Sequence, residues 1–408
     1  MEYIKEIRKL WIGQPGTFPV FLEENPGIFK KVDAVQKKEN EKLIEEISQK
    51  MRKKAQQRPE GEEERVQWEY ELEQELKGFL EKEKILCLSE WMGGELLDAF
   101  ERETKNFIGR VRGFDEALEP EQIWQAMRNY FIYGMIVEMQ GGEQNADDPI
   151  LAYSLLYPYT DNYIDDKKIS REKKAQYNRM IGRKLKGEAV EPGNRLEEKT
   201  CRLLDMILSA YEGEAKNKVV SVLLQLLEAQ SCSIGQMKQD IEEERILEIS
   251  IRKGGSSVLA DYLFATEDWR EQEEKFYLKF GFILQLVDDL QDMEEDGKAG
   301  SHTLMTNAAK EKRLEEQGNR LLWFIWSEIS AFVPKNPRLK EFVLKNCIEI
   351  SILSASAVGS AGGGIRKGFF SEGYLKALEP YLPVSIEFIK RMKIQKKRNG
   401  MPNSMVML

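Results

Sequence analysis

Residues 281–292 read Gly-Phe-Ile-Leu-Gln-Leu-Val-Asp-Asp-Leu-Gln-Asp, a mostly apolar stretch that nevertheless carries three carboxylates. Its spacing predicts a helix with Gly281, Gln285, Asp288, Asp292 and Glu295 on one continuous face. A helix that is apolar over most of its circumference is normally buried, and a buried carboxylate needs charge and hydrogen bonds to compensate it. Hard divalent cations such as Mg²⁺ supply this through oxygen ligands, so the stretch predicts a bound cation.

The composition excludes several classes of protein. The chain has 408 residues, a formal net charge of −9, four widely spaced cysteines and one histidine, His302. Its acidity argues against a nucleic-acid partner, because phosphate backbones require a concentrated basic surface. The cysteines and the lone histidine do not indicate a disulfide framework or a multi-histidine metal site. No signal peptide is indicated and no apolar run reaches ~18 residues, so we expect a soluble, cytoplasmic protein.

Helical spacing runs through nearly the whole chain and predicts an all-α fold, a single large helical bundle around a central cavity. Residues 13–27 are expected to be irregular, and two charged amphipathic helices are expected between residues 37 and 84, with a break at residues 59–61. The main core is expected from Ile123 onward. The stretch 359–364 lacks a preceding strand, so it is not a dinucleotide fingerprint. Helix ends and loops are predicted at Pro192-Gly193, Lys253-Gly254-Gly255, Asp296-Gly297 and Gly362-Gly363-Gly364.

A second acidic group, Asp-Asn-Tyr-Ile-Asp-Asp at residues 161–166, also follows an apolar helical run. Asp161 and Asp165 lie one helical turn apart on the same face, and Asp166 can join them if the helix end unwinds slightly. Taken alone, such a group could be a helix terminus running into solvent. Two such groups, each at the end of a core-like helix, instead favour a shared cavity with metal between them.

The two groups together resemble the motifs of the class I isoprenoid synthases, the helical superfamily of farnesyl diphosphate synthase, squalene synthase and the terpene cyclases. Residues 281–292 match the trans-prenyltransferase signature Gly-x-x-[Phe/Leu]-Gln-x-x-Asp-Asp-x-x-Asp at every defined position. The first motif departs from Asp-Asp-x-x-Asp, since Asn162 replaces the second aspartate. Residues 252–262, which read Arg-Lys-Gly-Gly-Ser-Ser-Val-Leu-Ala-Asp-Tyr, are similar to a segment of bacterial large-terpene synthases.

The resemblance spans roughly residues 120–395. It implies an isoprenoid synthase type I fold for residues 121–395, an N-terminal extension of charged helices at 1–120, and a flexible tail at 396–408. The sequence leaves open whether the N-terminal helices cap the core, form a homodimer surface or contact a membrane peripherally.

In that superfamily the two acidic motifs hold a cluster of Mg²⁺ ions, expected here to number about three, which binds the diphosphate of an allylic isoprenoid and acts as a Lewis acid. The resemblance implies that Asp161, Asp165, Asp288 and Asp292 are catalytic metal ligands. Asp166 is expected to assist them. Asp289 is expected either to bind metal directly or to orient a ligand.

Basic and apolar residues near the motifs complete the implied substrate site. Arg252, Lys253 and Lys298 are candidates for the diphosphate oxygens, and Gln285 belongs to the matched signature. Each lysine could equally be a solvated surface charge. Tyr157 and Leu156 stand four and five residues before the first aspartate, where prenyltransferases limit product length, and Tyr153 continues the same face. The aromatic rings would attract and shield a carbocation.

These residues favour a Mg²⁺-dependent class I terpene synthase that ionises a linear prenyl diphosphate, cyclises or rearranges the cation, and releases diphosphate. A head-to-tail prenyltransferase that adds isopentenyl diphosphate is the alternative favoured by the second motif. A non-catalytic helical partner subunit that retains the fold is a third hypothesis, from a different class of protein.

Overall fold

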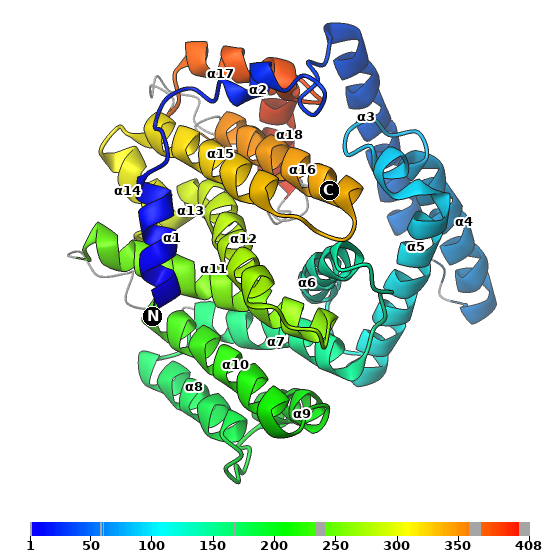
Figure 1. Cartoon of the computed structure of the whole chain (residues 1–408). Coiled ribbons are helices and arrows are strands. Elements are labelled where there is room, and N and C mark those ends of the chain that lie inside the picture. The colour runs from blue at the N-terminus through cyan, green and yellow to red at the C-terminus, as the bar shows by residue number, and fades with distance from the viewer. Residues whose placement is uncertain are drawn as a thin grey trace.

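The computed structural model of the chain describes residues 2–57, 59, 61–166, 168–233, 241–358 and 369–399. Within these ranges, the side chains of Ala55, Asp165, residues 394–399 and some residues between 62 and 76 are outside the description. The described residues form helices and no strand, which confirms the all-α prediction (Figure 1). None of these helices is long and apolar enough to cross a membrane.

The α-helices differ greatly in length. The N-terminal third contains α1 (Glu2–Ile12), α2 (Phe21–Glu24), α3 (Ala34–Gln56), α4 (Glu62–Leu80) and α5 (Leu88–Phe114). The middle contains α6 (Pro120–Met139), α7 (Asp148–Asp165), α8 (Arg171–Leu185), α9 (Arg195–Ser209), α10 (Gly213–Ser233), α11 (Glu243–Ala265) and α12 (Glu271–Gln291). The rest comprises α13 (Met293–Ala299), α14 (Leu304–Lys310), α15 (Leu314–Ala331), α16 (Pro337–Ala357), α17 (Glu372–Leu378), the 3₁₀ turn η2 (Glu379–Tyr381) and α18 (Ile386–Asn399).

The centre of the bundle is the crossing of α11 and α12, around which α6, α7, α15 and α16 are arranged (Figure 1). A Cβ atom on Gly254 would overlap the carbonyl oxygen of Gly281, and one on Gly281 would overlap the carbonyl oxygen of Gly254. The prediction of a loop at Lys253-Gly254-Gly255 was therefore wrong. These glycines lie inside α11, where the absence of side chains lets two backbones approach closely.

Other predicted boundaries had mixed outcomes. Pro192-Gly193 lies in the connection between α8 and α9, as predicted. Asp296-Gly297 is inside the short helix α13, which ends at the left-handed Gly300, so that predicted loop was misplaced by a few residues. Residues 359–368 and 400–408 lie outside the described residues. The predictions for Gly362-Gly363-Gly364 and for most of the flexible tail fall there, while residues 396–399 belong to α18.

The N-terminal third has two parts with different surroundings. Ile7 and Trp11 of α1 are buried in the core, and the Trp11 ring meets Phe282 and Phe324 edge-on at centroid distances of 5.6 and 5.7 Å. By contrast, α3 and α4 form the predicted pair of charged helices, which lies on one side of the bundle (Figure 1). Helix α6 begins at Pro120, where a proline in the first turn and a capping box start the helix.

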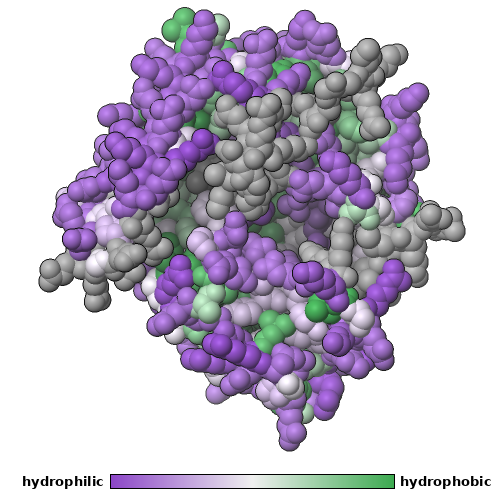
Figure 2. All heavy atoms as spheres, turned by 180° about the vertical axis from the view of Figure 1, so that it is seen from behind, coloured by the Kyte–Doolittle hydropathy of each residue, from purple (hydrophilic) through white to green (hydrophobic). Residues whose placement is uncertain are grey.

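The face opposite to that of Figure 1 is predominantly hydrophilic, with only scattered hydrophobic patches (Figure 2). This agrees with a chain in which 32% of the residues are charged. The apolar residues that set the helical spacing form one core cluster extending from α1 to α18.

Candidate metal and diphosphate site

The second acidic motif lies where α12 ends. The helix stops at Gln291, and Asp292 caps it with φ −95° and ψ 4°. The predicted continuous helical face through Glu295 was therefore wrong, because Glu295 belongs to the separate helix α13. The C-terminus of a helix carries partial negative charge from its unpaired carbonyls. Carboxylates at this position are destabilised unless a cation is nearby.

Burial and mutual repulsion strongly perturb two of these carboxyls. Burial, together with the neighbouring charges of Asp288 and Asp296, raises the pKa of Asp289 to about 8. Burial and repulsion from Asp288, Glu295 and Asp296 raise the pKa of Asp292 to about 7. Asp289 Oδ1 accepts a hydrogen bond from Gln285 Nε2 at 2.8 Å, whereas its buried Oδ2 has no hydrogen-bond partner among the described residues. An oxygen in this state is available to a cation or a proton.

The first acidic motif lies at the end of α7 and is more exposed. Asp161 Oδ1 accepts hydrogen bonds from Gln230 Nε2 of α10 at 2.6 Å and from Thr160 Oγ1 at 3.2 Å. The helix ends at Asp165, whose side chain is outside the description. Asp166 follows in extended conformation, and its Oδ1 accepts from the backbone amide of Lys168 at 2.8 Å. In this conformation the Asp166 carboxylate supports the turn that leaves the helix.

Asn162, the departure from the family pattern, forms a link between helices. Its Nδ2 donates to Gln125 Oε1 of α6 at 3.1 Å, and Gln125 Nε2 donates to Asn162 Oδ1 at 3.3 Å. An ionised aspartate at this position could only accept, so the exchange in both directions requires the amide. In this chain Asn162 therefore attaches α7 to α6.

One helical turn further along α6, Arg128 approaches the second motif. Its guanidinium is 3.7 Å from Asp288 Oδ1, with both side chains about 48% exposed, and its charge opposes the upward pKa shift of Asp292. Arg128 was not among the predicted site residues. A polar Gln-x-x-Arg face on a largely apolar helix was the available signal. Because Gln125 contacts the first motif and Arg128 the second, α6 brings both motifs to one end of the bundle.

The three predicted basic residues lie in different surroundings. Lys253 lies near the second motif, where its charge favours ionisation of Asp289. Arg252 is directed elsewhere, because it pairs with Glu248 at 3.1 Å and Glu228 at 3.4 Å and is only 16% exposed. Its assignment to the diphosphate is therefore not supported by the geometry. Lys298 is exposed on α13.

The predicted floor residues Tyr153 and Tyr157 lie on α7, which continues through Pro158 without a break. Tyr153 donates to the carbonyl of Ser257 on α11 at 3.0 Å, and the Tyr157 hydroxyl bonds with Ser257 Oγ. Burial raises the pKa of both tyrosines, so both hydroxyls remain protonated. Leu156 is half-buried against the core. The two rings thus lie between the first acidic motif and the interior of the bundle.

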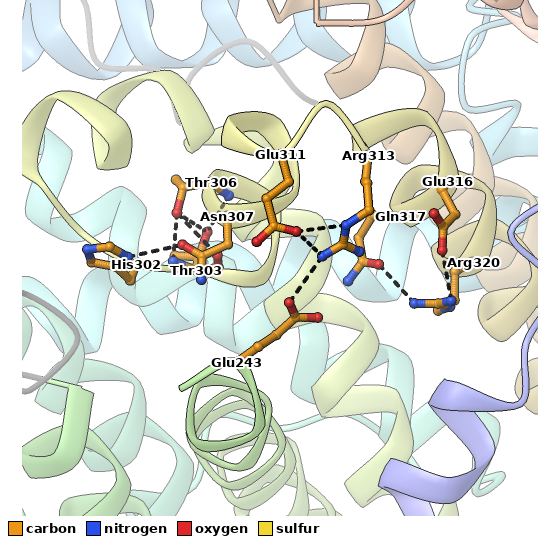
Figure 3. A network of polar contacts seen from close by, with 10 residues as sticks. All are labelled: Glu243, His302, Thr303, Thr306, Asn307, Glu311, Arg313, Glu316, Gln317 and Arg320. Atoms are coloured by element: carbon orange, nitrogen blue, oxygen red, sulfur yellow. Dashed lines mark hydrogen bonds and ion pairs between the residues drawn. The ribbon is translucent and has the colours of Figure 1, made fainter. Parts of the chain in front are cut away.

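The segment after the second motif is held by local contacts. His302 Nδ1 is 3.0 Å from Asn307 Oδ1, and Thr303 caps α14 through Thr306 (Figure 3). Further along, Arg313 bonds with Glu311 and reaches Glu243 of α11 at 3.2 Å (Figure 3). The Arg313–Glu243 pair links the start of α15 to the first turn of α11.

The geometry gives a mixed result for the predicted cavity and metal centre. Two surface hollows of about 500 and 420 Å³ lie at α8–α10 and at residues 22–31, and neither is lined by the acidic motifs. Within the described part of the chain, no three carboxylate, histidine or cysteine groups converge enough to hold one ion, and the Asp165 side chain is outside that part. The donor chemistry nevertheless fits Mg²⁺, because carboxylate oxygens, including the unpartnered Asp289 Oδ2, lie at two helix C-termini.

No known protein-family model matches the chain, and no curated protein matches it either.

Proposed function

We propose that this protein is a Mg²⁺-dependent class I terpene synthase with the isoprenoid synthase type I fold, acting on a linear prenyl diphosphate. The observation that carries the proposal is the pair of contacts from one turn of α6, Gln125 to Asn162 and Arg128 to Asp288. They place the two acidic motifs, 127 residues apart in sequence, at the same end of the helical bundle.

Each residue of the site has a definite role under this proposal. The metal ions would be held by Asp161, Asp165, Asp166, Asp288, Asp289 and Asp292. When bound, Mg²⁺ supplies Lewis-acid stabilisation of the diphosphate leaving group. Lys253 and Arg128 bring positive charge to the diphosphate oxygens, and Gln285 holds Asp289 in position through its hydrogen bond.

The aromatic residues below the first motif would receive the hydrocarbon. Tyr153 and Tyr157 present rings whose faces attract positive charge, and their buried hydroxyls are already bonded to Ser257. The bonded hydroxyls are therefore poorly placed to trap a carbocation. Exclusion of water from this region would prevent capture of the carbocation by water before it cyclises or rearranges.

The test is magnesium-dependent release of diphosphate from allylic substrates of ten to thirty-five carbons, with products identified by mass spectrometry. The double variant Asp288→Asn/Asp292→Asn is expected to lose release by about 10²-fold or more, since it removes charge from one half of the site. The matched control is Asp268→Asn, an exposed aspartate whose ion pair with Arg270 lies outside the site. No release by the unmodified protein with any of these substrates would reject the proposal and favour the partner-subunit alternative.

A head-to-tail prenyltransferase is the second candidate, favoured by the complete signature at residues 281–292. The engagement of Asn162 by Gln125 weighs against it, because the first motif then lacks the full aspartate set that chain elongation usually retains. Turnover that strictly requires isopentenyl diphosphate as a second substrate would favour the prenyltransferase over the synthase.

A further inference from the structure

Asp261 is a completely buried acid that the proposed site does not use. It lies on α11 with 0% of its surface exposed. It follows Lys253 by eight residues on the same helix, which corresponds to roughly 12 Å along the helix axis. Asp261 is therefore separated from the diphosphate end of the bundle by about the length of a short hydrocarbon chain.

The two oxygens of Asp261 have different environments. Asn129 Nδ2 of α6 donates to Oδ1 at 3.0 Å and also contacts Ser154 Oγ of α7 at 3.1 Å. Oδ2 is buried and has no hydrogen-bond partner among the described residues. Burial raises the pKa of Asp261 well above its usual range, opposed only by the Asn129 hydrogen bond. Burial therefore favours the protonated form of the carboxyl group, and the unpartnered Oδ2 is the oxygen that the Asn129 hydrogen bond leaves for a proton.

Three tyrosines lie within electrostatic range of Asp261. The ring of Tyr153 contacts those of Tyr157 and Phe264, at centroid distances of 5.6 and 5.2 Å. The charge of an ionised Asp261 would reach Tyr133, Tyr153 and Tyr157, because it contributes to the raised pKa of each. A protonated carboxyl group close to aromatic rings can donate a proton to an alkene, and the rings can stabilise the resulting cation.

A purely structural role explains this arrangement less well. Asn129 could join α6 to α7 and α11 through any neutral acceptor, and leaving a buried oxygen without a hydrogen-bond partner is destabilising. Asparagine at position 261 would accept the same hydrogen bond without being an acid. The one property that the carboxyl group adds is a transferable proton.

We propose that Asp261 is an acid–base residue that protonates a carbon–carbon double bond of the bound isoprenoid, a step that rests on the proposed function. The Oδ2–H bond breaks, the π electrons of the alkene form a new C–H bond, and a tertiary carbocation remains. Asn129 stabilises the carboxylate by its hydrogen bond to Oδ1. When the cation collapses, a neighbouring C–H bond supplies the electrons of a new double bond, and its proton returns to Asp261. The sequence of steps is redox-neutral and consumes no co-reactant.

The test is a single turnover in D₂O with enzyme in excess, after long equilibration so that Asp261 carries deuterium. The product of the unmodified enzyme is expected to contain one non-exchangeable deuterium. Asp261→Asn keeps the size and the acceptor oxygen but has no acidic proton, so labelled product should fall by about 10²–10⁴-fold. Magnesium-dependent release of diphosphate should persist in this variant. The control is Glu349→Gln, which removes another buried carboxyl, paired with Lys345 on α16, and should give the label and product of the unmodified enzyme.

The possible outcomes separate the two proposals. Unlabelled product from the unmodified enzyme, or full labelling by Asp261→Asn, overturns the role of Asp261 and leaves the synthase proposal standing. No diphosphate release from the unmodified enzyme overturns the synthase proposal itself. If Asp261→Asn does not fold, as judged by circular dichroism, the label in the unmodified enzyme decides the question together with Asp261→Glu, which retains an acid and should retain the label.

Discussion

The ends of α7 and α12 carry similar acidic sequences but have different physical states. At the end of α12, Asp289 is buried and one of its oxygens has no hydrogen-bond partner among the described residues. Burial and neighbouring carboxylates raise its pKa. At the end of α7, Asp161 is half-exposed and already accepts hydrogen bonds from Gln230 and Thr160. The α12 end therefore needs a cation or protons for its own stability, whereas the α7 end can exist without either.

The largest expected effect tests this difference in the metal-free protein. The pKa of Asp289 is about 8 in the folded state and about 3.9 in the unfolded state. The contribution of protonated Asp289 to the free energy of unfolding is therefore complete below about pH 4 and is lost as the pH rises through 8. Asp289→Asn should therefore be more stable than the unmodified protein at pH 8.5, by up to about 5 kcal/mol, with the gap closing towards pH 4. Urea unfolding in the presence of a chelator measures this difference in the free energy of unfolding.

The comparison variant is Asp161→Asn, which retains an oxygen that can accept the hydrogen bond from Gln230. Its free energy of unfolding should differ from that of the unmodified protein by no more than about 0.5 kcal/mol. Equal effects of the two substitutions would show that the two helix ends do not differ in the way described.

A second prediction concerns the crossing that supports the α12 end. Gly281→Ala should lower the free energy of unfolding by about 1–3 kcal/mol, because the added methyl group overlaps the backbone of Gly254 and forces α11 and α12 apart. The control is Gly78→Ala on α4, where nothing lies within 4 Å of the new methyl group. That substitution should stabilise the protein by up to about 1 kcal/mol through helix propensity. Thermal unfolding followed by circular dichroism distinguishes the two.

Arg128 is expected to matter for anion binding more than for stability. Its ion pair with Asp288 is half-exposed, so Arg128→Gln should change the free energy of unfolding by less than about 1 kcal/mol. Binding of inorganic diphosphate in the presence of Mg²⁺, measured by calorimetry, should weaken by about tenfold or more, because a charged hydrogen bond is lost. Arg183→Gln, which breaks the exposed pair with Glu188, is the control and should leave binding unchanged. Equal diphosphate affinity in both variants would remove Arg128 from the site.

The substitution with the smallest expected effect puts an aspartate at position 162, as in the Asp-Asp-x-x-Asp motif, at the end of α7. Asn162→Asp abolishes the donation to Gln125 and should cost no more than about 1 kcal/mol, since the pair is exposed. The added carboxylate should tighten Mg²⁺ binding, as measured by calorimetry on the two proteins side by side. Weaker Mg²⁺ binding by the variant would mean that the link between α6 and α7 contributes more to the site than the added charge.

The fold class was predictable from sequence because helical spacing depends only on local order. The contacts between residues of different helices were not predictable from sequence. Lys253-Gly254-Gly255 resembles a helix end, since a glycine used for close packing and one used for a turn look alike until the partner backbone is known. Arg252 and Lys253 are adjacent in sequence but about 100° apart around α11, so one pairs with Glu248 and the other approaches Asp289.

The acidic residues proposed for the site came from sequence motifs, whereas their neighbours in the fold could not be predicted in this way. Arg128 carries no signature by itself, and only the position of α6 between α7 and α12 connects it with Asp288. The role of Asn162 was hidden for the same reason, because its partner Gln125 is 37 residues away. Such contacts are set by tertiary packing, which residue spacing within one helix does not encode.

The N-terminal segment has a consequence for how the protein is made. Asn319 Nδ2 on α15 binds the carbonyl of Gly16 at 3.0 Å across 303 residues, and the amide of Val32 binds the carbonyl of Pro380 at 2.7 Å. At about 5–20 residues per second, the ribosome needs roughly 15 to 60 s to synthesise the chain between Gly16 and Asn319. During that interval Trp11 and Phe21 have no α15 to pack against. Residues 11–21 are thus buried only after α15, about 300 residues further along the chain, has been synthesised.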